Sequence, residues 1–243
     1  MRVGLYATCL ADTVRPDVAS AAMALLEQAG CEVVVPVQSC CGQPAYNGGE
    51  RALAKRLAWH VVQSFADLDY VVLPSGSCTA MMRLHYPRLF EGDARLAEVD
   101  AFATRVYELS EFLVSVLQVA LPPAPFEGAV TYHDSCSGLR ELGIKSQPRQ
   151  LLACVPGLKL IEAPTAEQCC GFGGTFSVKF SEVSCAIADR KCADLTATGA
   201  GTWVGGDLGC LLHLEGRMRA QGDQSTQLLH YAEILAGTAK RPA

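Results

Sequence analysis

Two pairs of adjacent cysteines, each followed by glycine, are the residues of this sequence best suited to chemistry. One pair opens the segment Cys-Cys-Gly-Phe-Gly-Gly at residues 169–174, and the other opens Cys-Cys-Gly-Gln-Pro at residues 40–44. Adjacent side chains of a strand point to opposite faces, so only a turn can direct both sulfurs to one place. Glycine allows such a turn because it tolerates positive φ and a close approach of the backbone. The duplication predicts two sites that gather thiolates.

Two more cysteines complete each predicted site. Cys9 and Cys78 lie before and after the first pair, and Cys136 and Cys210 lie before and after the second pair at similar separations. Each set therefore offers four sulfur ligands that are distant in sequence. The eight candidate metal ligands are Cys9, Cys40, Cys41, Cys78, Cys136, Cys169, Cys170 and Cys210.

Four thiolates in one place are the ligands of an iron–sulfur cluster or of a structural zinc ion. Structural zinc usually uses local Cys-x-x-Cys hairpins, which neither half contains, so the pattern favours iron–sulfur and leaves zinc as the alternative. A thiol–disulfide protein that uses adjacent cysteines ranks last, because vicinal disulfides are strained. The other four cysteines are predicted to behave as small core hydrophobes. They are Cys31, Cys154, Cys185 and Cys192.

The composition is that of a globular protein with unusually many thiols. Twelve of the 243 residues are cysteine, half are hydrophobic, and the net charge is −5. A chain of this size can bury a core without disulfides, so the thiols predict a reducing compartment, the cytoplasm. No Lys/Arg run offers an electrostatic footprint for nucleic acid. No apolar run approaches the ~20 residues of a membrane span, and the first residues are too short and polar a stretch for a signal peptide.

Predicted strands alternate with predicted helices along the chain. The strands are expected at residues 2–7, 31–37, 70–73, 105–108, 129–132, 159–162, 202–204 and 227–230. The helices are expected at residues 12–29, 49–66, 111–119, 147–154 and 182–196, with a last helix beginning at residue 232. This order predicts an α/β fold with two Rossmann-like parallel-sheet halves, related by a pseudo-two-fold internal repeat. A Pro-rich linker at 121–125 separates a first cysteine-rich repeat, residues 1–121, from a second, residues 126–243.

The predicted topology explains how the cysteines could meet. In an open parallel sheet, the loops after the carboxyl ends of the strands form the binding crevice, and all eight candidate ligands follow a predicted strand. They also lie near helix N-termini, whose dipoles favour thiolate over thiol. Gly76 and Gly209 come just before a cysteine and are predicted to donate N–H hydrogen bonds to sulfur, and Gly171 is predicted to shape the cofactor turn.

Three segments of the second half resemble motifs of the cysteine-rich CCG-domain family, most closely the lactate utilization protein A family. They are Tyr132–Cys136, Cys169–Lys179 and Gly206–Cys210. The resemblance covers nearly the whole chain. It implies a soluble component of a three-protein L-lactate oxidation system, which transfers electrons through iron–sulfur clusters, expected to be of the 4Fe-4S type. The implied partners are a ferredoxin-like iron–sulfur protein and a third small subunit.

The chain departs from the family pattern at the last cysteine of each repeat. Met81 and His213 stand at those positions, so we expect four thiolates in a site rather than five. Met81 is expected in the core. His213 could be a nitrogen ligand, but its helical surroundings favour a partly buried helix histidine.

Polar residues near the second site have two interpretations each. His133 could serve a cluster or substrate as a hydrogen-bond donor or proton relay, or it could simply pack while Asp134 caps the next turn. Asp207 is expected to hold its glycine-rich turn by a side-chain hydrogen bond. No residue is assigned a catalytic role. Because no flavin motif is visible, the protein is expected to be a non-catalytic or co-catalytic subunit of a dehydrogenase complex.

Overall fold

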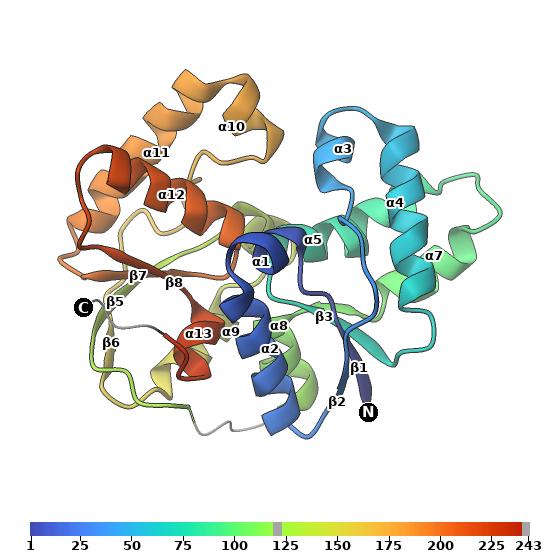
Figure 1. Ribbon diagram of the computed structural model, residues 1–243, viewed down its shortest axis with the longest axis horizontal. Helices are drawn as coiled ribbons and strands as arrows, with labels where there is room; N and C mark the ends of the chain where they lie inside the picture. Colours follow the sequence, from blue (N-terminus) through green and yellow to red (C-terminus); the bar gives the residue numbers. More distant parts are fainter. Residues whose placement is uncertain (119–122, 240–243) are drawn as a thin grey trace. The chain divides into compact units, whose positions relative to one another are not determined.

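The computed structural model describes residues 1–118 and 123–239 (Figure 1). The chain divides into two compact units, unit 1 at residues 1–121 and unit 2 at residues 122–243. Each unit contains one four-stranded sheet in which every strand pair is parallel. The predicted α/β fold class, with a parallel sheet in each half, is confirmed.

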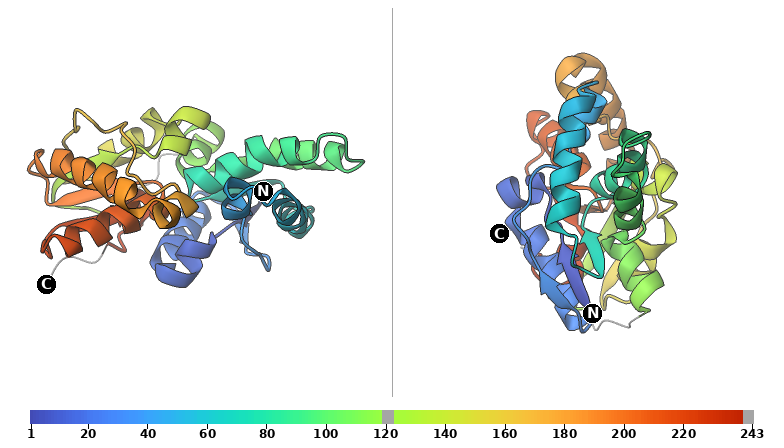
Figure 2. Two further views of the ribbon diagram at one scale, coloured as in Figure 1. Left: turned by 90° about the horizontal axis from the view of Figure 1, so that it is seen from above. Right: turned by 90° about the vertical axis from the view of Figure 1, so that its right-hand side faces the viewer.

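The sheet of unit 1 has the order β2-β1-β3-β4. Its strands are β1 (Arg2–Leu5), β2 (Glu32–Val34), β3 (Tyr70–Leu73) and β4 (Val106–Glu108). The helices are α1 (Cys9–Val14), α2 (Pro16–Gln28), α3 (Gln43–Asn47), α4 (Arg51–Ser64), α5 (Gly76–Ala80), α6 (Tyr86–Leu89), α7 (Leu96–Ala103) and α8 (Leu109–Glu111), with π-helical turns η1 (Met81–His85) and η2 (Phe112–Leu117). With right-handed crossovers, this order places α2 on one face of the sheet and α4 on the other (Figure 2).

The sheet of unit 2 repeats this order as β6-β5-β7-β8. Its strands are β5 (Gly128–His133), β6 (Leu158–Leu160), β7 (Thr202–Gly205) and β8 (Gln227–His230). Its helices are α9 (Ser146–Ala153), α10 (Thr175–Lys179), α11 (Ser181–Thr196), α12 (Leu208–Ala220) and α13 (Tyr231–Leu235), with the π-helical turn η3 (Ser137–Glu141). The shared strand order agrees with an internal repeat.

Several parts of unit 1 differ from the predicted elements, among them the unpredicted helix α3. The single helix expected at residues 12–29 is two helices, α1 and α2, because Pro16 has no N–H and pushes Arg15 out of the helical conformation, to φ −141°. No element is predicted for residues 76–103, where α5, η1, α6 and α7 lie. The predicted helix at 111–119 is helical as far as residue 117, and its last residue lies outside the described residues, as do the first two residues of the predicted linker.

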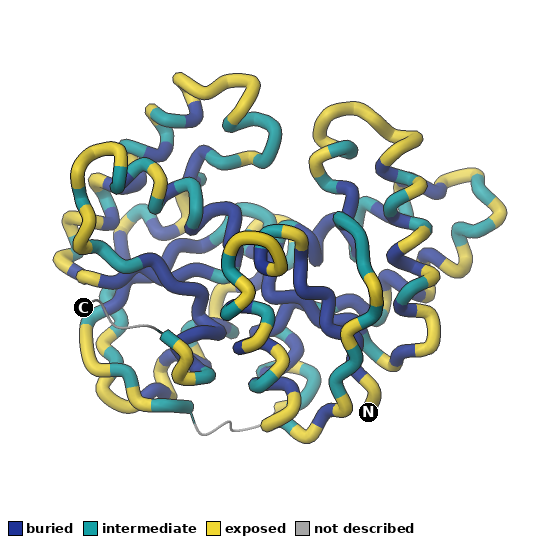
Figure 3. The backbone as a smooth tube through the Cα atoms, in the orientation of Figure 1, coloured by how far each residue is buried: buried dark blue, intermediate teal, exposed yellow. Residues whose placement is uncertain are grey.

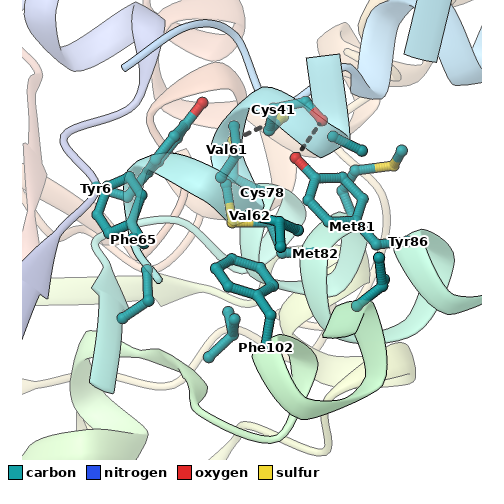
Figure 4. Packing of buried hydrophobic residues seen from close by; sticks show 14 of the residues in the cluster. Tyr6, Cys41, Val61, Val62, Phe65, Cys78, Met81, Met82, Tyr86 and Phe102 are labelled. Carbon is teal, nitrogen blue, oxygen red and sulfur yellow. Dashed lines mark hydrogen bonds between the residues drawn. The ribbon is translucent and has the colours of Figure 1, made fainter. Parts of the chain in front are cut away.

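The cores lie on the sheets. The strands β1, β3, β5, β7 and β8 are mostly buried, whereas the edge strands β2 and β6 contain no buried residue, and many loops and outer helix faces are exposed (Figure 3). In unit 1, Tyr6, Phe65, Tyr86 and Phe102 pack in one buried core together with cysteines 41 and 78 (Figure 4). The candidate ligands of unit 1 are therefore partly built into the hydrophobic core. Within residues 1–118 and 123–239, no helix has the length and hydropathy that crossing a membrane requires.

Candidate metal centres

In unit 1 the four candidate sulfurs form a continuous chain at the carboxyl ends of β1, β2 and β3. Cys41 Sγ lies 3.4 Å from Cys78 Sγ. Cys40 is in hydrogen-bonding contact with both Cys9 and Cys41. The structure thus brings together residues that are up to 69 positions apart, since Cys9 and Cys78 end the chain of contacts (78 − 9). This juxtaposition is a direct result of the strand order.

Local turns and caps hold these sulfurs in place. Gly42, at φ +83°, makes the turn after the cysteine pair, and its N–H points at Cys40 Sγ at 3.5 Å. Ser75 caps α5 by accepting the Cys78 N–H at 3.2 Å. The hydroxyl of Tyr86 donates to the Cys41 carbonyl oxygen at 2.8 Å (Figure 4). Each inner cysteine is therefore fixed through its own backbone.

Unit 2 repeats the chain of sulfur contacts. Cys169 is in hydrogen-bonding contact with Cys136 and Cys170, and Cys170 in turn with Cys210. The N–H of Gly171 points at Cys169 Sγ at 3.3 Å, and the next N–H, of residue 172, points at Cys170 Sγ at 3.4 Å. Two adjacent donors at this turn favour charge on the sulfurs.

Each site is graded from a solvent-facing side to a buried side. Among the candidate ligands, Cys9 is exposed, and Cys40, Cys136 and Cys169 have intermediate exposure. The buried ligands are Cys41, Cys78, Cys170 and Cys210. A bound metal group would therefore have its inner edge shielded from water and its outer edge near the surface.

The sulfurs of a site hold unequal charge. Hydrogen bonds from Cys41 and Cys9 lower the pKa of Cys40 to about 2, and bonds from Cys136 and Cys170 lower the pKa of Cys169 to about 2. The same contacts, followed by burial, raise the pKa of their donors, including Cys9 and Cys136. In each site the hydrogen bonds between the sulfurs therefore give one cysteine, Cys40 or Cys169, a lowered pKa.

This arrangement fits a metal group. A cation removes the repulsion between neighbouring thiolates, and ligation deprotonates the remaining thiols. Four soft sulfur donors suit an iron–sulfur cluster and zinc alike. The donor set therefore fits the implied cofactor and leaves its type open.

The polar residues beside the second site take different roles from some of those expected. Asp134 does not cap the following turn: Ser135 does so, accepting the N–H of residue 138 at 3.2 Å. Asp134 is instead 2% exposed and accepts two hydrogen bonds from Arg149, at 2.8 and 2.9 Å. His133 is 1% exposed, and neither of its ring nitrogens has a hydrogen-bond partner. Burial, with the nearby Lys191 charge, lowers the pKa of His133 to about 3.

The glycines predicted to donate hydrogen bonds to sulfur differ in what their N–H groups contact. Asp207 accepts the Gly209 N–H at 3.2 Å, so the predicted side-chain hydrogen bond of Asp207 is confirmed, and this N–H points at a carboxylate oxygen. Gly209 is needed for space instead, since a Cβ there would lie 2.6 Å from the Phe172 ring. Gly76 is the first residue of α5. The N–H donors to sulfur are supplied by the residues that follow the cysteine pairs, Gly171 among them.

The two residues that depart from the family pattern, Met81 and His213, both pack within their units. Met81 is fully buried in the core of unit 1, as expected. His213 lies in α12 with its Nε2 atom 3.1 Å from Ser184 Oγ, which agrees with a partly buried helix histidine. Of the cysteines assigned to the core, Cys31 and Cys192 are buried, Cys185 is half-buried and Cys154 is exposed, so the last assignment is wrong. Cys154 follows α9, where its thiol donates to the carbonyl of residue 150 at the surface.

Lys191 is a polar residue that the sequence analysis does not identify. It is 1% exposed, and its Nζ donates to the carbonyl oxygens of Thr165 and Ala166, the latter at 3.1 Å. That loop leads to Cys169, and the lysine charge acts on Cys210. A signal exists in the sequence, because Lys191 lies on the helix face that also carries Ala188 and the other buried residues of α11.

The fold and the sites define an α/β protein with a four-cysteine centre in each of two repeated units. The family model of the cysteine-rich domain, CCG, matches residues 3–83 and again residues 130–215. Lactate utilization protein A of Geobacillus kaustophilus is 46% identical over 97% of this chain and 98% of its own length. The protein of the same name from Bacillus subtilis is 43% identical over 97% of this chain and 99% of its own length.

The chain therefore belongs to the cysteine-rich domain family and, within it, to the family of lactate utilization protein A. A crystal structure of a hypothetical protein from Helicobacter pylori matches the fold with a TM-score of 0.69 and 14% identity. That match covers 99% of this chain, which spans 49% of the Helicobacter protein, and it concerns the fold alone.

Proposed function

We propose that this protein is an iron–sulfur electron-transfer subunit of a complex that oxidises L-lactate. The observation that carries the proposal is the continuous chain of contacts that joins four sulfurs in each unit, at the carboxyl edge of its sheet. The name of the relatives, lactate utilization protein A, supplies the metabolic context. A cluster of the 4Fe-4S type, when bound, supplies reversible one-electron transfer.

The residues of the chain hold the cluster and tune its charge. The proposed ligands are Cys9, Cys40, Cys41 and Cys78 in unit 1, and Cys136, Cys169, Cys170 and Cys210 in unit 2. The inner sulfurs are shielded from water, and backbone N–H groups donate to Cys40, Cys169 and Cys170. Such hydrogen bonds stabilise negative charge on sulfur and raise the reduction potential of a bound cluster.

The proposed role needs partners that carry the other steps. We infer that lactate is dehydrogenated elsewhere in the complex and that electrons pass through this subunit to or from a ferredoxin-like iron–sulfur protein, with a third small subunit. The partly exposed outer sulfurs, such as Cys40 and Cys169, support exchange of electrons at the surface.

Anaerobic purification tests the cofactor. The protein should be brown, with broad visible absorbance and with iron and acid-labile sulfide in equal amounts. The Cys170→Ser variant should lose iron from unit 2 and keep its far-ultraviolet circular dichroism, since the core of this large unit does not depend on the metal. Colourless protein with stoichiometric zinc, or unfolding of Cys170→Ser, would instead favour a zinc-stabilised structural module.

A further inference from the structure

Beside the second site, hydrogen bonding does not account for the burial of His133. It is the last residue of β5, 1% exposed, and both Nδ1 and Nε2 lack a partner. Burying a polar group without a hydrogen bond costs free energy. Such a group in a native structure points to a ligand that satisfies it.

The surroundings of His133 show which ligand that is. One ring nitrogen of His133 and the sulfurs of Cys170 and Cys210 all lie within 4.8 Å of one another. A metal atom that binds nitrogen at about 2.0 Å and sulfur at about 2.3 Å can contact ligand atoms with this separation. All three residues are buried, so the three ligand atoms face the inner side of the site.

The corresponding position in unit 1 carries a different residue with a satisfied side chain. Leu5 pairs with Val72 in the first sheet, and Tyr132 pairs with Val204 at the corresponding place in the second sheet. The residues that follow, Tyr6 and His133, therefore occupy equivalent positions. The Tyr6 hydroxyl donates to the Ser39 carbonyl oxygen. At this strand position, unit 1 therefore has a tyrosine whose hydroxyl is already hydrogen-bonded, whereas unit 2 has an imidazole that can bind a metal.

We propose that His133 is a direct nitrogen ligand of the metal centre in unit 2 beside Cys170 and Cys210, in place of one of the outer thiolates, which makes the two centres of the protein chemically different. The proposal rests on the proposed function, because it assumes that the sulfurs hold an iron–sulfur cluster. In this proposal His133 binds the metal through one ring nitrogen, rather than serving as a hydrogen-bond donor or a proton relay.

Pulsed electron paramagnetic resonance of the reduced, anaerobically prepared protein tests this ligation without a mutation. Protein labelled with ¹⁵N only at histidine should show a ¹⁵N coupling in place of the ¹⁴N coupling of unlabelled protein. The coupling should be of the size found for Rieske centres, in which histidine binds iron directly. Absence of a histidine coupling, or one too small for a bound nitrogen, would overturn the proposal.

Two variants assign the coupling to a residue. His133→Gln should abolish it and speed the loss of iron from unit 2 to a chelator by roughly 10-fold or more. The matched control is His213→Gln, which removes a second histidine of unit 2, in contact with Phe172 and Ser184, and should leave the coupling intact. Persistence of the coupling in His133→Gln, or its loss only in His213→Gln, would contradict the assignment.

Iron and sulfide analysis of the same samples separates the two levels of inference. Protein without iron and sulfide would refute the proposed iron–sulfur function. Protein with clusters in both units and no histidine nitrogen at either would refute the role of His133 alone. If His133→Gln fails to fold, the labelling experiment on the unaltered protein still decides the question.

Discussion

Cys40 and Cys169 hold equivalent places in the two sites, directly before the buried cysteine of each pair. Each accepts hydrogen bonds from two neighbouring thiols and from the N–H two residues later, of Gly42 or Gly171. Three donors converging on one sulfur favour its charged form over burial. Hydrogen bonding therefore favours the thiolate form at this position in each site.

In the metal-free protein, Cys40 and Cys9 should differ in how the rate of alkylation depends on pH. The pKa of Cys40 is lowered to about 2, so its thiolate fraction is already complete throughout the neutral range. The initial rate with iodoacetamide should be nearly the same at about pH 6 and about pH 8. Cys9, whose pKa is raised by its contact with Cys40, should react slowly at both values although it is more exposed. Mass spectrometry of peptides from briefly treated protein measures both rates.

Cys169 and Cys136 allow the same comparison in unit 2. The pKa of Cys169 is lowered, like that of Cys40, and the pKa of Cys136 is raised, like that of Cys9. A rate at Cys40 or Cys169 that rises tenfold for each unit of pH would show an ordinary thiol there. The hydrogen-bonding arrangement of the sulfurs would then be incorrect.

At the scale of elements, the turn between the cysteine pair and the following helix depends on a single glycine. Gly171 has φ +89°, and a Cβ there would lie 2.5 Å from the Ser184 carbonyl oxygen in α11. The Ser184 hydroxyl donates to the Gly171 carbonyl oxygen at 2.8 Å, which holds the turn against the helix. Gly174 also has positive φ, at +63°, but has open space where a Cβ would stand.

Alanine at these two glycines should therefore have unequal effects on stability. Gly174→Ala meets no neighbouring atom, so its cost is the backbone strain of φ +63° and ψ −113° alone. Gly171→Ala adds a backbone clash to the strain of its positive φ and should lower the free energy of unfolding by more than Gly174→Ala does. Urea unfolding monitored by Trp203, which is buried in β7, reports on unit 2 when Trp59 is replaced by phenylalanine. Equal destabilisation by the two substitutions would exclude the clash with α11.

A second element-level contact joins the end of β5 to α9. Arg149 is bidentate to Asp134, binds Glu162 as well, and stacks on the Tyr132 ring at 5.0 Å. Asp134 is buried, so its carboxylate depends on this arginine for compensation.

Removal of the arginine should be costly. Arg149→Ala should lower the free energy of unfolding by about 3 kcal/mol, since an uncompensated buried carboxylate remains. Lys145→Ala, which breaks the exposed ion pair with Glu167, should have almost no effect and serves as the control. The double variant Asp134→Asn with Arg149→Met should recover part of the loss. Chemical denaturation of the three variants makes the comparison, and an Arg149→Ala loss no larger than that of Lys145→Ala would contradict it.

For the whole molecule, the sequence allows the sheets and the gathering of the cysteines to be predicted because both depend on local signals. Short apolar runs such as 70–73 and 227–230 coincide with β3 and β8, and cysteine pairs followed by glycine require turns. Parallel strands then bring residues such as Cys9 and Cys78 to one edge. The helices at 76–103 escape prediction because glycine and Pro87 resemble loop signals there, although proline is tolerated in a first helical turn.

The parts that sequence could not supply depend on tertiary contacts. The pattern places His133 at a strand end but cannot show that both ring nitrogens are buried without partners. Likewise, Lys191 finds its carbonyl partners in a loop 25 and 26 residues away. Asp134 pairs with Arg149 rather than with its neighbours in sequence. Such choices follow from packing, which a one-dimensional spacing does not encode.

Each site draws its four cysteines from one unit only, so the two centres should load independently. The double variant Cys41→Ser with Cys78→Ser removes the two buried ligands of unit 1, and serine oxygens are poor ligands for soft metals. We expect iron and sulfide to fall to about half of the unaltered protein, with the centre of unit 2 retained. Cys31→Ser removes another buried thiol of unit 1 and should leave the iron content unchanged. Loss of all iron from the double variant would mean that the two centres are not separate, and full retention would mean that Cys41 and Cys78 hold no metal.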